Sequence, residues 1–151
     1  MNPGNLVFQP LSMDPKSACV AFHELTLLRI PHFSHCGIFV ENGQMMTASG
    51  KVELQDAGAT GNIAVGFAWE NWTATKAWLF SQMGKPYDFV GWFLAAVQPL
   101  TPFYRPPIDP NAYLCSSIVA AALLRNDAAR FAALNHRTVT PDDVARAVGA
   151  L

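Results

Sequence analysis

The sequence predicts an α+β fold, because strand-like segments occupy the first half of the chain and helix-like segments the second. The chain has 151 residues, which suits a single domain with one core, so we expect one domain over residues 1–151. Hydrophobic residues make up 51% of the chain and charged residues only 14%. This is the composition of a compact globular protein rather than a disordered one.

Short apolar runs bounded by turn residues predict the strands of a small antiparallel sheet. The pair Asn42-Gly43 indicates a tight hairpin turn, because both residues support the positive φ that such turns need. The expected strands cover residues 4–10, 35–40, 45–49, 51–54 and 63–68.

One helix is expected among these strands, over residues 16–28, with Asp14 as N-cap and Pro15 at its first position. Helical spacing places Glu24 on the face opposite the apolar stripe. That stripe consists of Ala18, Cys19, Phe22 and Leu25.

Helical patterns and capping residues predict the second half of the chain. Gly84 ends one helix, and Thr140 and Pro141 begin the last one as N-cap and first helical residue. The segment that follows Cys115 is apolar on every face, so we expect it to be buried. The expected helices cover residues 71–83, 89–97, 118–124, 128–134 and 141–148.

The charge and cysteine counts exclude several classes of protein. The formal net charge of −1 does not suit a nucleic-acid or anionic-membrane surface. Three cysteines do not form a disulfide framework and are expected to be free thiols. The N-terminus lacks the basic and apolar regions of a signal peptide, and no apolar stretch is long enough to span a membrane. We therefore expect a cytoplasmic protein, or one carried in a virion or other assembly.

Cys115 is the best candidate nucleophile, because it stands where an apolar helix begins. A helix N-terminus favours a thiolate, which is the reactive form of cysteine. The alternative is an inert core cysteine. A thiol nucleophile needs a base, and His35 begins a core strand that can hold its ring rigidly. His32 and His136 lie in expected loops, and His23 lies at the flank of its helix.

Three short motifs resemble those of a known family. His35-Cys36-Gly37-Ile38, with Gly43 behind it, looks like the His-x-Gly-Ile-x-x-x-x-Gly hairpin of NlpC-type cysteine hydrolases. Gly84-Lys85-Pro86-Tyr87 is similar to their Gly-x-x-Tyr motif, and Cys115-Ser116-Ser117 resembles their Cys-Ser-Glu nucleophile motif. The order, histidine first and cysteine last, is that of the circularly permuted branch, which includes YiiX-like proteins and the lecithin:retinol acyltransferase group.

The resemblance implies a papain-like fold, with a small antiparallel sheet packed against helices and the nucleophile on a buried helix. It implies Cys115 as nucleophile, His35 as general base and then general acid, and the backbone N–H of Cys115 as oxyanion donor. It places Tyr87 beside the nucleophile, although Tyr87 could equally be a turn residue that packs on the core. Ser117 stands where many relatives carry Glu, and Thr47 stands where relatives place a polar residue that orients the histidine.

The expected role of Thr47 depends on the register of the hairpin. With a three-residue loop over 41–43, Thr47 becomes a diagonal neighbour of His35 on the same face of the sheet. A two-residue Asn42-Gly43 turn would shift the pairing by one residue and place Thr47 on the other face. The family spacing favours the three-residue loop. A threonine hydroxyl can accept an N–H from the ring, but it cannot supply the charge of an ionic partner.

The resemblance implies a cysteine amidase or endopeptidase that acts through an acyl-enzyme, with bacterial cell-wall peptide as the leading substrate. A second hypothesis is a weakly catalytic or non-catalytic binding module of a phage tail or secretion assembly. A third is a lipid acyl hydrolase or transferase, in which residues 89–94 line an acyl pocket. For residues 89–94 themselves, the favoured prediction is simple packing in the core. No cofactor is expected. The spacing of His32, His35 and Cys36 matches no common zinc pattern, so no metal is expected either.

Overall fold

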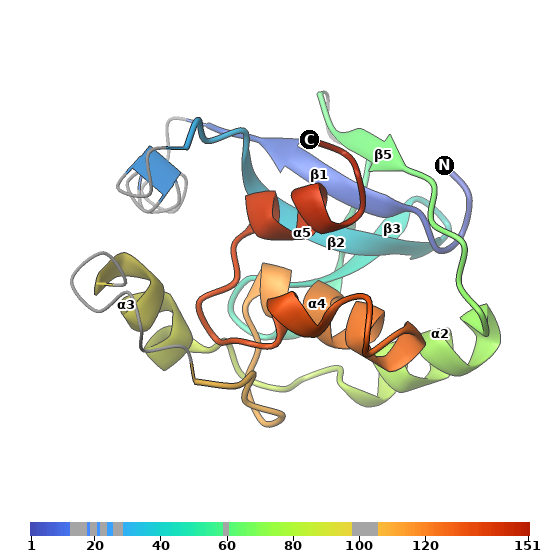
Figure 1. Cartoon of the computed structure of the whole chain (residues 1–151). Coiled ribbons are helices and arrows are strands. Elements are labelled where there is room, and N and C mark those ends of the chain that lie inside the picture. Colours follow the sequence, from blue (N-terminus) through green and yellow to red (C-terminus); the bar gives the residue numbers. More distant parts are fainter. Residues whose placement is uncertain (13–17, 19–20, 22–23, 26–28, 59–60, 98–105) are drawn as a thin grey trace.

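The computed structural model describes residues 1–12, 18, 21, 24–25, 29–58, 61–97 and 106–151. The expected α+β class is confirmed: one antiparallel sheet packs against helices (Figure 1). The sheet has the strand order β4-β3-β2-β1-β5, so β2 lies at its centre. Its strands are β1 Leu6–Pro10, β2 Phe33–Glu41, β3 Gln44–Ala48, β4 Val52–Asp56 and β5 Ile63–Val65.

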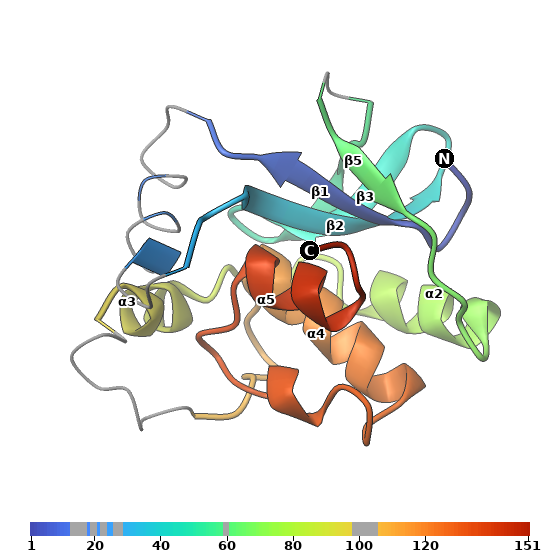
Figure 2. The ribbon, with the colours of Figure 1, turned by 45° about the horizontal axis from the view of Figure 1, so that its top comes forward.

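The second half of the described chain is helical apart from its connections (Figure 2). The N-cap of α2 is Asn71, whose side chain accepts the N–H of Ala74 at 3.0 Å. The last helix begins with the expected cap, because the Thr140 hydroxyl accepts the N–H of Asp143 at 3.1 Å. The helices are α2 Trp72–Ser81, α3 Phe89–Val97, α4 Cys115–Asn126, the 3₁₀ turn η2 Ala132–Leu134 and α5 Pro141–Ala147.

Two expected elements keep only about half of their expected length. The strand expected over residues 63–68 ends at Val65, after three pairs with β1. The helix expected over residues 128–134 is reduced to η2, and the Asp127 side chain accepts the N–H of Arg130 at 2.9 Å in the turn before it. Most of the helix expected over residues 16–28 lies outside the described residues, although residues 18, 21, 24 and 25 are helical.

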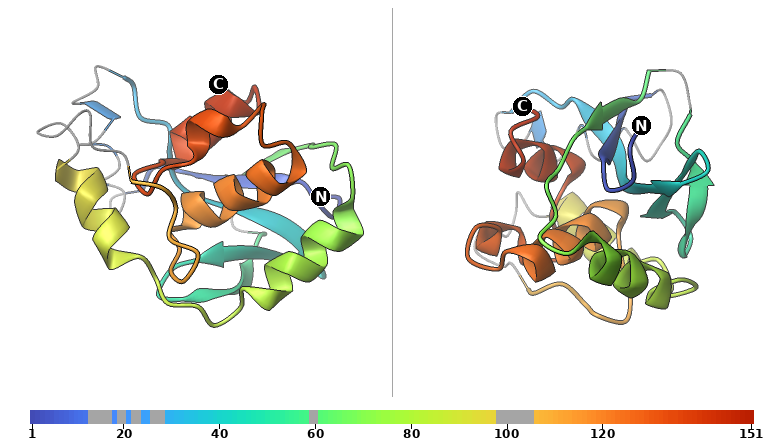
Figure 3. Two further views of the ribbon diagram at one scale, coloured as in Figure 1. Left: turned by 60° about the horizontal axis from the view of Figure 1, so that its bottom comes forward. Right: turned by 90° about the vertical axis from the view of Figure 1, so that its right-hand side faces the viewer.

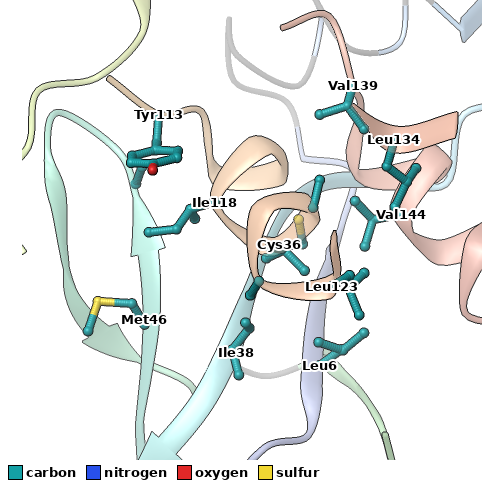
Figure 4. Close-up of a cluster of buried hydrophobic side chains, with 14 of the residues drawn as sticks. Leu6, Cys36, Ile38, Met46, Tyr113, Ile118, Leu123, Leu134, Val139 and Val144 are labelled. Carbon is teal, nitrogen blue, oxygen red and sulfur yellow. The ribbon is translucent and has the colours of Figure 1, made fainter. Parts of the chain in front are cut away.

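The main core lies between one face of the sheet and the helices α2, α4 and α5 (Figure 3). The close-up in Figure 4 shows side chains of β1, β2 and β3 meeting those of α4 and α5. The other face carries a much smaller buried cluster, formed by Val7, Phe39, Met45 and Ala57. α4 is therefore enclosed between the sheet and other helices, which agrees with the buried helix predicted from its apolar faces.

α3 has an unexpected environment. Residues 89–94 were expected to pack in the core, but the side chains of Phe89, Val90 and Phe93 are 68%, 58% and 59% exposed. Gly91 is the buried residue of the first turn, and its N–H donates to the Asp88 carboxylate at 2.8 Å. α3 lies away from the sheet, beyond the N-terminal end of α4 (Figure 1). The preference for core packing was therefore wrong.

Glu24 also differs from its expected place on the polar face. It is fully buried, while Leu25 is 59% exposed. The Glu24 carboxylate accepts a hydrogen bond from the Thr140 hydroxyl at 2.7 Å and one from Arg146 at 2.9 Å. A buried carboxylate is tolerated when it is paired in this way. Of the expected apolar stripe, the described residues Ala18 and Leu25 are exposed. The expected place of Glu24 on the polar face was therefore wrong, and its partners lie more than 100 residues later in the chain.

Candidate active site

Cys115 is the first residue of α4, and it is almost buried at 8% exposure. Leu114 before it is extended, so the chain enters the helix sharply at the cysteine. The Ser117 hydroxyl accepts the N–H of Leu114 at 2.7 Å, as a Glu at this position would in a capping box. Ser117 therefore caps the helix that carries Cys115. The Ser116 hydroxyl donates to the carbonyl of Val139 at 2.6 Å and ties the same turn to the segment before α5.

His35 and Thr47 come from adjacent strands and meet directly. Nε2 of His35 lies 3.0 Å from the hydroxyl oxygen of Thr47, which is fully buried. The same hydroxyl lies 2.7 Å from the carbonyl oxygen of Cys36 and donates to it. Because its single proton is used there, the hydroxyl must accept from His35. Nε2 therefore carries a proton, so the basic nitrogen of the neutral ring is Nδ1.

Two side chains, those of Cys36 and His35, influence the ionisation of the Cys115 thiol. Hydrogen bonding with Cys36 is the largest influence and lowers the pKa of Cys115 well below the usual cysteine range. Burial opposes this shift, whereas the charge of His35 and a side-chain hydrogen bond with it lower the pKa further. The structure thus brings together Cys115 and His35, which are 80 residues apart, around an acidic thiol.

Cys36 has the opposite chemistry. Burial, the hydrogen bond with Cys115, the charge of Cys115 and the charge of Asp142 all raise the pKa of Cys36 well above the usual range. Cys36 is 1% exposed and belongs to the main core, as expected. Figure 4 shows it on β2, which packs directly against α4. No signal in the sequence predicts that Cys36 affects Cys115, because the two residues share no motif.

The hairpin reaches the expected register by a different route. Its turn is the two-residue Asn42-Gly43 turn, with φ of 51° and 76°, and not the expected three-residue loop. Glu41 pairs with Gln44, but Phe39 pairs with Met45, so Val40 is an extra residue in β2. This bulge cancels the one-residue shift that the tighter turn would cause. Thr47 therefore lies on the face of His35 after all.

Tyr87 lies beside the segment that leads into α4. It forms an isolated parallel bridge with Tyr113, two residues before Cys115, and its N–H donates to the carbonyl of Gly50 at 3.0 Å. Its ring packs edge-on against Phe89, with 5.1 Å between the ring centroids. This position suits both readings of Tyr87, a neighbour of the nucleophile and a turn residue that packs on the core.

His32 and His136 have structural partners. His32 lies 3.3 Å from the carboxylate of Asp142, which also accepts the backbone N–H of His32 at 2.9 Å. His136 is buried, and its Nδ1 lies 3.0 Å from the hydroxyl of Thr138. His23 and Cys19 lie outside the described residues. Among the residues that the structure describes, no group of three or more metal-ligating side chains is arranged to hold an ion.

Comparisons with protein-family models, with curated proteins and with solved structures found no match to this chain. The likeness to the permuted NlpC-type branch therefore rests on the sequence motifs around His35, Tyr87 and Cys115. Within the described ranges, none of the helices has the length and apolar character needed to cross a bilayer.

Proposed function

We propose that this protein is a cysteine hydrolase, an amidase or endopeptidase, with Cys115 as nucleophile and His35 as general base. The observation that carries the proposal is the convergence of Cys115, His35 and Thr47 at one site. Thr47 touches the His35 ring at 3.0 Å, and the pKa of the Cys115 thiol is lowered by partners that include His35. These are the same three residues that the motifs single out, and they come from three different elements.

The geometry supports a two-step reaction. Thr47 holds Nε2 of His35, so Nδ1 takes the proton of Cys115. The thiolate attacks the carbonyl carbon of an amide or ester, and the oxyanion is met by the N–H of Cys115 at the N-terminus of α4. The imidazolium then protonates the leaving group, which leaves an acyl-enzyme. Water, deprotonated by the imidazole, hydrolyses the thioester and restores the thiol.

The leading substrate is bacterial cell-wall peptide, which rests on the motif resemblance alone, because a fold does not fix a substrate. The test is incubation with purified peptidoglycan and mass spectrometry of the released fragments. We expect new peptide ends with the intact chain and none with Cys115→Ala or His35→Ala. Ser116→Ala, which lies on the same turn, is the matched control for damage to the helix start. Fragment release by Cys115→Ala equal to that of the intact chain would contradict the proposal.

A second candidate is a lipid acyl hydrolase or transferase, and one observation favours it. The exposed apolar side chains of α3 begin at Phe89, which packs against Tyr87 near the start of α4. The intact chain and the Cys115→Ala variant should also be incubated with a phospholipid and with a short-chain thioester. Acyl transfer to Cys115 from these donors, without release of cell-wall fragments, would favour the lipid reaction over the peptidase.

A further inference from the structure

A small polar pocket lies between α2 and α4, which pack side by side (Figure 1). Its volume is about 110 Å³, which is enough for several waters or for a ligand of a few heavy atoms. It lies at the end of α4 that is farther from Cys115, about 16 Å along the helix axis, so it is distinct from the candidate active site. The described residues that line it are Glu70, Asn71, Ala74, Thr75, Arg125 and Asn126.

Two side chains of opposite charge line this pocket without pairing with each other. Glu70 precedes α2, and Arg125 lies in the last turn of α4. Neither takes part in the ion pairs found among the described residues. The guanidinium of Arg125 lies over the ring of Trp78, 5.1 Å from its centroid, which orients the group and leaves its N–H donors for an acceptor. The pocket thus has a cation and an anion that a ligand can pair.

Thr75 is the residue of the pocket that indicates a ligand. It lies on the buried face of α2 and is 8% exposed. Its backbone N–H donates to the carbonyl of Asn71 at 3.0 Å, but its hydroxyl has no hydrogen-bond partner in the part of the chain that the structure describes. A buried hydroxyl without a partner is unfavourable, because it has lost its contacts with water. Because Thr75 lines the pocket, a ligand bound there can provide the missing partner.

Two asparagines add hydrogen-bond donors to the same pocket. Oδ1 of Asn71 accepts a backbone N–H of α2 at 3.0 Å, and Oδ1 of Asn126 accepts the N–H of Glu70 at 2.8 Å. The amide NH₂ group of each asparagine is therefore the end left for other contacts. Together with Arg125 and Thr75, these groups give the pocket several donors, whereas Glu70 is the only carboxylate among the described lining residues. This balance matches a ligand that carries one carboxylate and one ammonium group.

We propose that this pocket binds a small zwitterion, an α-amino acid with a short side chain. Its carboxylate accepts hydrogen bonds from Arg125 and Thr75, and its ammonium group donates to Glu70. Such a ligand pairs both charges and the buried hydroxyl at once. A simple anion would leave Glu70 without a partner, and a simple cation would leave Arg125 without one. The proposal goes beyond the hydrolase function and does not depend on Cys115.

The test is a titration of the intact, ¹⁵N-labelled chain with glycine at constant ionic strength, followed by backbone amide chemical shifts. We expect saturable shifts at residues 70–75 and 125–126, with a dissociation constant on the order of millimolar, because so small a ligand has few atoms that contribute to binding. Acetate and methylammonium each carry one of the two charges. They should bind at least about tenfold more weakly than glycine, because each leaves one charge of the pocket without a partner.

Three substitutions separate the two charges from the hydroxyl. Arg125→Gln and Glu70→Gln each remove one charge and should raise the dissociation constant at least about tenfold. Thr75→Val removes the hydroxyl with little change of volume and should raise it about fivefold. Thr75→Val should not lower the thermal midpoint, because the hydroxyl has no partner in the protein to lose. Arg130→Gln is the matched control and should bind glycine as before, because Arg130 lies over the ring of Phe131 and outside the pocket.

Several results would overturn the proposal. Absence of saturable shifts at these residues up to about 100 mM glycine would exclude a site for this ligand. Acetate or phosphate binding as tightly as glycine would make the pocket an anion site, and equal binding of methylammonium would make it a cation site. Unchanged affinity in both charge variants would place the bound glycine elsewhere. A Thr75→Val variant that unfolds at a clearly lower temperature would give the hydroxyl a structural role instead.

Discussion

Helices α3 and α4 are both apolar in sequence, but they occupy opposite environments. Most residues of α4 are buried between the sheet and other helices. α3 instead leaves Phe89, Val90 and Phe93 more than half exposed. The α4 sequence contains many small residues, Ala and Ser, which allow close approach to neighbouring elements, whereas the first half of α3 has large aromatic side chains around a buried glycine. Apolar composition therefore predicts a helix better than it predicts what the helix packs against.

The largest expected effect is a loss of stability when a buried side chain of α4 is truncated. Ile118→Ala in α4 should lower the free energy of unfolding by about 3 kcal/mol, because it leaves a cavity in the main core. Denaturant unfolding followed by circular dichroism measures this. A loss below about 1 kcal/mol would show that α4 is not enclosed as the structure has it.

Within α3, the smallest residue should matter more than the largest ones. A Cβ on Gly91 would collide with the Asp88 carboxylate and the backbone carbonyl of Arg137. Asp88 cannot easily move, because it is 3% exposed and its carboxylate accepts Nε of Arg137 at 2.8 Å. Gly91→Ala should therefore cost about 2 kcal/mol of unfolding free energy, although alanine favours helix formation. A variant as stable as the original would show that α3 can shift freely.

The start of α4 should also differ from the core in reactivity. Near neutral pH, Cys115 should alkylate at least about tenfold faster than Cys36, because its lowered pKa keeps it as thiolate. Lowering the pH through that pKa protonates the thiol and slows the reaction. Cys36, with its raised pKa, should become reactive only in alkali. Peptide mass spectrometry after brief labelling compares the two, and equal rates would remove the distinction between them.

Thr47 should have a smaller effect on the same thiol. Thr47→Val removes the hydroxyl that holds Nε2 of His35 and should slow hydrolysis about fivefold, while Thr47→Ser should retain the rate. Thr47→His offers a stronger partner and should raise the rate if it fits. Steady-state rates on the substrate found by fragment analysis provide the test. Full activity in Thr47→Val, with no gain in Thr47→His, would mean that another group orients His35.

The smallest expected effect is on the exposed face of α3. Phe93→Ser should change the free energy of unfolding by less than about 0.5 kcal/mol, because the side chain is already largely in water. It should reduce the binding of a hydrophobic dye, which reports exposed apolar surface. A loss comparable to that of Ile118→Ala would show that Phe93 is covered, and the contrast between the helices would no longer hold.

Much of the layout could be predicted from local signals. Caps such as Thr140 and Asn71 mark helix starts, and Asn42-Gly43 marks the turn, because each acts through its own backbone neighbourhood. The burial of Glu24 could not be predicted, because its partners Thr140 and Arg146 are distant in sequence.

In the candidate site, too, some features could be predicted from sequence signals and others depend on contacts between distant segments. His35, Thr47 and Cys115 were found through motif order and hairpin spacing. The influence of Cys36 on the pKa of Cys115 was missed, because it arises only when α4 packs on β2. The predicted turn type was wrong, because the turn has two residues and not three. The predicted register was nevertheless right, because the bulge at Val40, which has no clear sequence signal, compensates for the shorter turn.

The extra residue Val40 has a consequence for insertions and deletions during evolution. Removing it would place the pair Phe39 and Met45 directly beside the pair Glu41 and Gln44, as in a regular ladder. His35 and Thr47 would keep their contact at the expense of one buried valine, although eleven positions instead of twelve would separate them in the chain. A deletion between His35 and Phe39 would instead shift His35 by one position and place it on the opposite face from Thr47. Homologous chains that differ in hairpin length by one residue are therefore compatible with the same pair, provided that the change falls at the bulge.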